Sequence, residues 1–306
     1  MTERLMLLDT ASLYFRAFYG IPDTITAADG RSVNGVRGLL DFIARLVSDF
    51  EPTHLVACWD ESWRPSWRVD LIPSYKAHRV AREVPEGVDV EEVPDLLSPQ
   101  VPMISELLGL LGIPVVGAPD HEADDVIGTL STQASMPVDV VTGDRDLFQL
   151  ADDEADIRII YTARGMSRLE LVTDAVVRAK YGVAAAQYAD FAVMRGDASD
   201  GLPGVAGIGE KTAAGLLAEF GDLDGIRAAA GDPAVALSAS VRAKIVAASD
   251  YLDVAPTVVE VVRDLDLGEV DAAIRPLSAT ARAEVDALTA EWNLGGSLAR
   301  ALKALG

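Results

Sequence analysis

The chain has 306 residues, half of them apolar and 24% charged, which excludes a disordered chain and allows one large domain or two modest ones. It carries 48 acidic against 26 basic residues, and a net charge of −22 taken alone argues against a polyanionic partner. One cysteine and three histidines exclude a disulfide framework and argue against a zinc site. No apolar run approaches the ~18 residues that span a membrane, so we expect a cytoplasmic protein with no membrane partner.

The first half of the chain alternates between short apolar runs and longer periodic segments. Near-continuous apolar runs, typical of strands buried on both faces of a parallel sheet, occupy residues 5–8, 54–59, 114–116, 138–142 and 157–161. Helical periodicity marks residues 36–50, where Asn34 is the expected cap, and residues 104–111 and 124–134. This alternation predicts an α/β fold with a mostly parallel central sheet flanked by helices.

Strand signals nearly vanish after residue 172. Helices are expected at residues 173–181, 187–195, 210–220, 240–252 and 280–292, and glycines close the first three of them. We therefore predict an α/β region at residues 1–172 and a helical C-terminal region at residues 173–306.

Carboxylates follow three of the predicted strands at equivalent places. Asp9 and Asp60 close their runs, and Asp144 follows a third run after one glycine. Ligands bind beyond the carboxyl ends of parallel strands, so these acids converge on one crevice if the strands are neighbours. The alternative is that each is an ordinary turn aspartate.

Further acids follow in pairs and triplets. Glu122, Asp124 and Asp125 open a predicted helix, where acids are also favourable for helix stability alone. Two other pairs complete a set of nine with the strand-end acids, namely Asp144 with Asp146 and Asp197 with Asp200. Two carboxylates ~4 Å apart repel by ~4 kcal/mol at an effective dielectric constant of ~20, so such a cluster needs cations. Hard oxygen ligands indicate Mg²⁺ or Mn²⁺, and this many acids indicate at least two ions, as in phosphoryl displacement.

A glycine-rich segment follows Asp200. Residues 204–212 nearly match a phosphate-binding Walker A loop, but Glu210 separates Gly209 from Lys211 and no strand precedes the segment. We interpret it as a hairpin between two helices whose free N–H groups hold backbone phosphates, with Lys211 and Thr212 adding charge and a hydroxyl. A tight helix–helix turn with no ligand is the alternative.

One basic stretch interrupts the acidic chain. Residues 74–82 carry Lys76, Arg79 and Arg82 beside Tyr75, and tryptophans are interleaved with arginines just before them. Aromatic and cationic side chains together are typical of contacts to unpaired bases and phosphates. An ordinary exposed helix face is the alternative.

As a set, these motifs resemble the bacterial 5′ nucleases: the 5′→3′ exonuclease domain of DNA polymerase I and its stand-alone relatives in the flap endonuclease superfamily. The motifs that carry the resemblance, from about residue 4 to residue 265, are Leu8-Asp9, Tyr14-Phe15-Arg16, Trp59-Asp60, Tyr75-Lys76-Ala77-His78-Arg79, Glu122-Ala123-Asp124-Asp125, Gly143-Asp144-Arg145-Asp146 and Gly196-Asp197-Ala198-Ser199-Asp200 running into the hairpin. The resemblance implies a PIN-like core with a basic arch segment at about residues 64–100. It also implies a helix–three-turn–helix at about residues 186–221.

The resemblance also implies roles for individual residues. It implies one metal group of Asp9, Asp60, Glu122, Asp124 and Asp125, and a more distant one of Asp144, Asp146, Asp197 and Asp200, with Asp125 bridging the two. It implies that Lys76 and Arg79 contact the scissile phosphate, so that these two and Asp125 are the expected catalytic residues. It implies DNA contacts by Arg16, Tyr75, Lys76, Arg79, Gly207, Gly209, Lys211 and Thr212, with Tyr75 stacking on a base. It implies K⁺ at the main-chain carbonyls of Val205 and Ile208.

We therefore predict a metal-dependent 5′→3′ exonuclease and flap endonuclease that cuts DNA 5′ ends, 5′ flaps and RNA primers in replication and repair. A PIN-type ribonuclease and a non-catalytic DNA-junction binding module are the alternatives. No polymerase follows residue 306, so if this chain is complete we expect it to work alone or with a separate DNA polymerase. We also expect a monomer. Two features depart from the family pattern, Gly201 where relatives often carry Asn, and the acidic residues 83–92 beside the arch.

Overall fold

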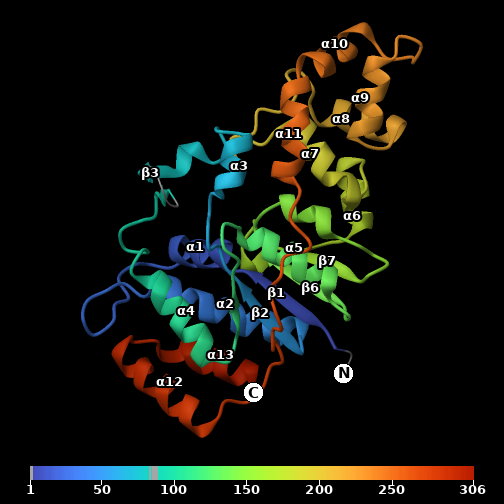
Figure 1. The fold of residues 1–306 in the computed structure, drawn as a ribbon. Helices are drawn as coiled ribbons and strands as arrows, with labels where there is room; N and C mark the ends of the chain where they lie inside the picture. The colour runs from blue at the N-terminus through green and yellow to red at the C-terminus, as the bar shows by residue number, and fades with distance from the viewer. Residues whose placement is uncertain (1–2, 83, 85–88) are drawn as a thin grey trace.

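A parallel sheet forms the centre of the N-terminal half. The computed structural model describes residues 3–82, 84 and 89–306 (Figure 1). The sheet consists of β1 (Leu5–Asp9), β2 (His54–Cys58), β5 (Val115–Val116), β6 (Val138–Thr142), β7 (Ile157–Tyr161) and β8 (Glu170–Val172). Its order is β5-β2-β1-β6-β7-β8, and neighbours are parallel except β7 and β8. The predicted mostly parallel sheet is confirmed.

The central strand β1 shows why its sequence is apolar throughout. Leu5 and Leu7 pack in one hydrophobic cluster, whereas Met6 and Leu8 pack in another on the opposite face, since successive side chains of a strand alternate. Helices cover both faces, as a parallel sheet requires. In this half they are α1 (Thr10–Gly20), α2 (Asn34–Phe50), α4 (Gln100–Leu110) and α5 (Ala123–Gln133), whereas α3 (Ser66–Leu71) lies away from the sheet (Figure 1).

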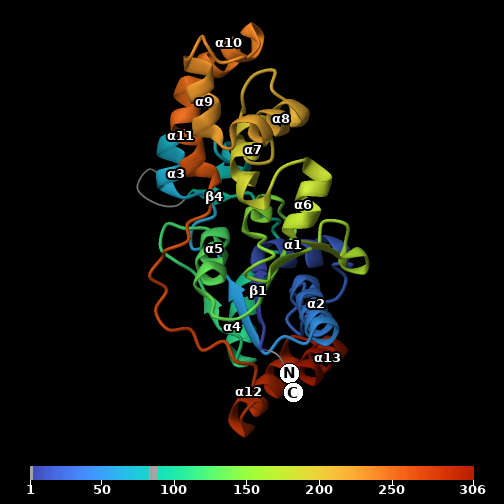
Figure 2. The same cartoon turned by 90° about the vertical axis from the view of Figure 1, so that its right-hand side faces the viewer.

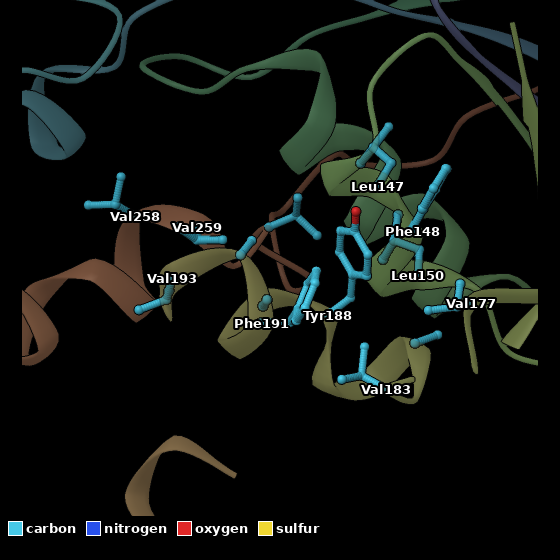
Figure 3. Packing of buried hydrophobic residues seen from close by; sticks show 14 of the residues in the cluster. Leu147, Phe148, Leu150, Val177, Val183, Tyr188, Phe191, Val193, Val258 and Val259 are labelled. Atoms are coloured by element: carbon cyan, nitrogen blue, oxygen red, sulfur yellow. The ribbon is translucent and has the colours of Figure 1, made fainter. Parts of the chain in front are cut away.

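The second region is helical. Its helices are α6 (Asp174–Tyr181), α7 (Tyr188–Arg195), α8 (Glu210–Phe220), α9 (Leu223–Gly231), α10 (Ala239–Ala247) and α11 (Ser249–Val259). Helices α8 to α11 lie at the end of the molecule away from the sheet (Figure 1). Tyr188 and Phe191 of α7 pack beside Leu147 and Phe148, which lie in the short helix η2 (Asp146–Leu150) after β6 (Figure 3). The helical region and the sheet therefore share a core.

The chain then returns along the sheet. Residues 260–278, which we call the strap, run from α11 back to the start of β2, where Leu55 N–H donates to the Ala272 carbonyl at 2.8 Å. Helices α12 (Ala279–Glu291) and α13 (Gly295–Leu305) follow, and α13 packs against α2 at the end opposite α10 (Figure 2). The strap thus connects the two ends of the molecule.

Two local predictions were wrong. The predicted helix at residues 240–252 is two helices that meet at Ala248, whose backbone leaves the helical conformation at φ −95° and ψ 10°. Asn34 does not cap α2 but is its first residue, and its amide donates to the Phe18 and Ile21 carbonyls at 2.8 and 2.9 Å. The side chain therefore fixes the turn between α1 and α2.

Within the predicted arch segment, β3 (Val80–Arg82) pairs antiparallel with β4 (Val90–Glu91). Residues 83 and 85–88, which include most of the acidic stretch, lie outside the described residues. The boundary at residue 172 stays a prediction. None of the helices in the described part of the chain combines the length and apolar character needed to cross a membrane.

Candidate active site

A cavity of about 330 Å³ lies at the edge where the central parallel strands end. The acids that line it are Asp9, Asp60, Glu91, Glu122, Asp124, Asp144 and Asp197, and the cations that line it are Lys76, Arg79 and Arg145. Strand β1 pairs parallel with β2 on one side and β6 on the other, so the acids that follow the three strands meet at one edge. The expected convergence of Asp9, Asp60 and Asp144 is confirmed; their role as metal ligands stays a prediction.

Asp9 is held by the start of the next helix. Its Oδ1 accepts a hydrogen bond from Ser12 N–H at 3.1 Å, which caps α1, and its Oδ2 accepts one from Thr142 Oγ1 at 2.7 Å. Burial raises the pKa of Asp9 to about 7, and the charges of Asp60 and Asp144 act in the same direction. The site therefore strongly favours a positive partner for this carboxylate.

Asp60 and Asp124 also have raised pKa values. Asp60 Oδ1 accepts from Ala123 N–H in the first turn of α5 at 2.7 Å, yet burial and then the charge of Glu122 raise its pKa to about 6. Burial, followed by the charges of Asp9 and Asp144, raises the pKa of Asp124 well above its usual range. Protons or cations must offset this charge.

In the second acid group, Asp144, Asp146, Asp197 and Asp200, the negative charge is only partly offset by hydrogen bonds and nearby cations. Asp146 Oδ1 is buried without a hydrogen-bond partner, and burial, then Asp144, Asp200 and Asp197, raise the pKa of Asp146. Burial would raise the pKa of Asp197, but hydrogen bonds from Ser199 and nearby arginine charge hold it below its usual range. A buried oxygen without a partner, beside other carboxylates, fits a ligand that the protein itself does not supply.

The donor set fits divalent cations, because every candidate ligand is a hard oxygen. In the described residues, however, no three acidic, histidine or cysteine side chains converge on one point closely enough to hold an ion. Mutual repulsion accounts for this spacing, since carboxylates without cations between them turn toward the nearest N–H or ammonium group.

Asp125 does not belong to the pocket. It is fully buried, its Oδ1 and Oδ2 accept from the Arg68 guanidinium at 2.7 and 2.9 Å, and its Oδ1 also accepts from Val262 N–H at 2.9 Å. The prediction that Asp125 is a metal ligand and catalytic residue bridging the two acid groups stays a prediction; in this structure both oxygens face Arg68 on the interior side of α5.

Glu122 connects the acids to the basic segment. Its Oε1 forms an ion pair with Lys76, and its Oε2 accepts from Arg68 and from the Tyr75 hydroxyl, each at 2.6 Å. Burial would raise the pKa of Glu122, but the charges of Lys76 and Arg68 hold it below its usual range. Glu122 is therefore an ionised acid whose two oxygens both face donors.

Tyr75 has a different environment from the predicted one. Its side chain is 4% exposed and packs in the core cluster, so its ring presents no free face to a base. This contradicts the prediction of base stacking. The aromatic residues that line the cavity are Phe15 and Trp63. Trp63 is one of the tryptophans interleaved with arginines, a pattern that predicts contacts to bases, whereas sequence reasoning gave Phe15 no individual role.

Lys76 and Arg79 both line the pocket, where the turn after Asp197 holds them. Lys76 has a left-handed backbone with φ 48°, and its N–H donates to the Asp200 carbonyl at 2.9 Å. Arg79 donates to the Ser199 carbonyl at 2.7 Å and to Asp200 Oδ1 at 3.0 Å. The basic segment and the second acid group thus form one unit.

The glycine hairpin lies between α7 and α8. Gly204 and Gly207 have φ +66° and +76°, which lets the chain turn tightly before Gly209 caps α8. Lys211 and Thr212 are exposed in the first turn of α8. A residue not predicted here, Lys244 of α10, donates from Nζ to the Gly207 carbonyl at 2.9 Å. The geometry suits phosphate contacts, which stay a prediction.

Arg16 and the proposed K⁺ carbonyls remain predictions as well. Arg16 of α1 lies beside the Gly143 turn and donates to the Ala163 carbonyl at 3.3 Å. The Val205 carbonyl accepts from Ile208 N–H at 2.9 Å within the hairpin.

Comparisons with known proteins give consistent results. Two sequence families match, described as "5'-3' exonuclease, N-terminal resolvase-like domain" over residues 4–182 and "5'-3' exonuclease, C-terminal SAM fold" over residues 183–280. A 5'-3' exonuclease of Streptomyces coelicolor is 59% identical over 300 residues, covering 98% of this chain and 99% of that protein. DNA polymerase I of Mycobacterium bovis is 43% identical over 248 residues, covering 78% of this chain and 26% of the polymerase.

The fold has counterparts among solved structures. The T5 D15 protein co-crystallised with metal ions superposes with a TM-score of 0.64 at 18% identity, covering 99% of this chain and 98% of that chain. At this identity the likeness concerns the fold.

Proposed function

The chain belongs to the 5′-3′ exonuclease family, and on this premise we propose that it hydrolyses phosphodiester bonds at 5′ ends and 5′ flaps of DNA, including RNA-primed duplexes. One observation carries the proposal: strand-end acids share a cavity with Lys76 and Arg79. Such a cavity can hold both divalent cations and the phosphate between two nucleotides. A ribonuclease would need no duplex-binding hairpin, so comparing the cleavage of flap DNA and RNA distinguishes the two functions.

We assign two or more Mg²⁺ or Mn²⁺ ions to the pocket. The residues that would hold them are Asp9, Asp60, Glu122 and Asp124 in one group and Asp144, Asp146, Asp197 and Asp200 in the other. When bound, such ions supply Lewis acidity, activating the attacking water and neutralising charge on the phosphate. The raised pKa values of Asp9, Asp60 and Asp124 support this assignment, because cations relieve the same repulsion as protons.

The protein's own cations act on the phosphate. Lys76 and Arg79 approach the cavity from the basic segment, where they can offset the charge that grows on the phosphate oxygens. Glu122 holds the Lys76 ammonium at the cavity wall, which fixes its direction before substrate arrives. Phe15 and Trp63 offer aromatic faces for a terminal base.

The hairpin of residues 204–212 and Lys244 would hold the duplex by its phosphates, reading no base sequence. K⁺ at the Val205 and Ile208 carbonyls would neutralise the same turn. We propose that the protein acts as a cytoplasmic monomer in replication and repair beside a separate DNA polymerase. The match to 26% of the length of a DNA polymerase I supports that pairing.

The test is cleavage of a labelled 5′-flap DNA duplex, a nicked duplex and a single-stranded RNA in Mg²⁺ or Mn²⁺. We expect cleavage of the DNA substrates, its abolition by EDTA, and a ~100-fold lower single-turnover rate in Lys76→Ala and Arg79→Ala. Lys303→Ala, on α13 at the far end of the molecule, is the matched control and should cleave normally. Preference for RNA, or no cleavage of DNA with either metal, would contradict the proposal.

A further inference from the structure

Arg68 lies at the meeting point of three separate segments. It belongs to α3 in the arch segment and is 2% exposed. Its Nη1 donates to Glu122 Oε2 at 2.6 Å and to Asp125 Oδ2 at 2.9 Å, and its Nη2 donates to Asp125 Oδ1 at 2.7 Å. Its Nε donates to the Val258 carbonyl at the end of α11 at 3.0 Å. One guanidinium therefore connects the arch segment, the start of α5 and the helical region.

Asp125 completes this arrangement from the other side. Besides Arg68, it accepts from Val262 N–H of the strap at 2.9 Å and from Glu122 N–H at 3.3 Å. Its adjacent residue, Asp124, lines the cavity, whereas Asp125 does not. Successive helical residues point ~100° apart, so the two acids have the same chemistry and opposite surroundings.

The shared partner is Glu122, whose carboxylate lies between Arg68 and Lys76. Two carboxylates, Glu122 and Asp125, face two cations, Arg68 and Lys76, so the buried charge balances. If the Arg68–Asp125 pair is broken, the Arg68 guanidinium is no longer held in place, and Glu122 Oε2 keeps the Tyr75 hydroxyl but loses its second fixed donor. The Lys76 ammonium then loses its fixed position at the cavity wall.

We propose that Arg68 and Asp125 are positioning residues for the cleavage reaction, which fix the Glu122 carboxylate and through it the Lys76 ammonium. The proposal rests on the 5′ nuclease function proposed above. Stability alone does not explain the pair, because apolar side chains of similar volume often stabilise a core as well as a buried ion pair does. The planar fork of arginine, which satisfies two acids and a carbonyl at once, provides fixed geometry.

The first experiment separates positioning from metal binding. Titration calorimetry of the DNA-free protein with Mn²⁺ would compare Asp124→Asn with Asp125→Asn. We expect Asp124→Asn to weaken the apparent affinity at least ~10-fold, because it removes a pocket oxygen, and Asp125→Asn to leave it within about twofold. A loss in Asp125→Asn equal to that in Asp124→Asn would make Asp125 a ligand and overturn the proposal.

The second experiment measures flap cleavage by Asp125→Asn and Arg68→Lys. We expect the single-turnover rate to fall ~10- to 100-fold while the substrate KM stays within about twofold, because the Lys76 ammonium is displaced and DNA contacts are kept. Arg68→Lys keeps the charge and loses the fork, so its defect reports geometry. Thermal unfolding would show that each variant is folded.

The matched control is Asp139→Asn. Asp139 of β6 is fully buried, forms ion pairs with Arg4 and Arg158, and lies outside the cavity. This variant should lose stability and keep the wild-type cleavage rate. Wild-type rates in Asp125→Asn and Arg68→Lys, or an equal fall in Asp139→Asn, would overturn the positioning role. A wild-type protein that does not cleave DNA would instead refute the proposed function, and the calorimetry would still decide whether Asp125 is a ligand.

Discussion

At the scale of single residues, protons and divalent cations compete for the same oxygens in the cavity. Asp9 and Asp60 have pKa values raised to about 7 and about 6 from an ordinary value of 3.8, chiefly by burial. In the metal-free protein these acids therefore take up protons that the unfolded chain releases. Such uptake couples folding, pH and metal binding.

This coupling predicts how stability depends on pH. An acid with a raised pKa stabilises the fold fully below its unfolded value, and this contribution is lost as pH rises through the folded pKa. In EDTA, we expect the free energy of unfolding to fall by on the order of 2 kcal/mol between about pH 5 and about pH 8. Saturating Mg²⁺ at the upper pH should restore it, as measured by thermal denaturation. A metal-free stability that is flat or rises across this range would contradict the pKa directions given above.

The site residues that could be predicted from the sequence are those whose position the backbone geometry of the sheet determines. Asp9 and Asp60 could be predicted because the carboxyl ends of neighbouring parallel strands must share an edge. Asp125 could not be separated from Asp124 without knowing which way α5 is rotated. Its partner, Arg68, lies 57 residues earlier in the chain, where nothing in the sequence marks the pairing.

At the scale of elements, the basic turn of residues 74–79 packs directly against the turn of residues 199–201. Ser74 Oγ donates to the Gly201 carbonyl at 2.8 Å, and a Cβ on Gly201 would lie 2.1 Å from the Ser74 carbonyl oxygen. Gly201 also has φ +72°. The absence of a side chain at this position, where relatives were expected to carry Asn, is what allows the two turns to meet.

We therefore expect Gly201→Ala to displace Lys76 and lower the rate of flap cleavage ~10-fold or more. Gly165→Ala is the control, because Gly165 also has positive φ, at +91°, but no atom lies within 4 Å of where its Cβ would stand. Both variants should lose ~1–2 kcal/mol from left-handed strain, measured by chemical denaturation. Equal cleavage rates in the two variants would show that the contact between the two turns is unimportant for catalysis.

Element boundaries in the helical region were predictable where capping chemistry marks them. Thr173 and Gly182 bound α6 as expected, since the threonine hydroxyl and the left-handed glycine satisfy the free ends of the helix. The break at Ala248 carries no glycine or proline and interrupts an apolar pattern that looks continuous. The sequence near residue 248 therefore holds no signal of where α10 ends and α11 begins.

At the scale of the whole molecule, the strap fastens the helical region to α5. The Val262 carbonyl accepts from Thr129 Oγ1 at 3.3 Å, and Gly128 allows close approach, because a Cβ there would lie 2.6 Å from the Val262 oxygen. An extended segment without regular secondary structure has no periodic sequence pattern, so its path along the sheet could not be predicted.

This contact predicts opposite effects for two glycine-to-alanine changes in helices. Gly109→Ala on the exposed face of α4, where nothing lies within 4 Å of a Cβ, should stabilise the protein by up to ~1 kcal/mol through helix propensity. Gly128→Ala should destabilise it by ~1–3 kcal/mol, because the strap must move. Denaturant unfolding measures both. Stabilisation by Gly128→Ala would mean that the strap is not held against α5.

The strap also means that the polypeptide passes between the sheet and the outer helices twice, once before α7 and once after α11. A body joined to its neighbour through two separate connections cannot swivel freely about either one. Two connections therefore restrict how far the spacing between the hairpin and the acid-lined cavity can change. With a duplex held at the hairpin as proposed, the place of incision follows from this spacing and from where the DNA duplex ends, whatever the bases are.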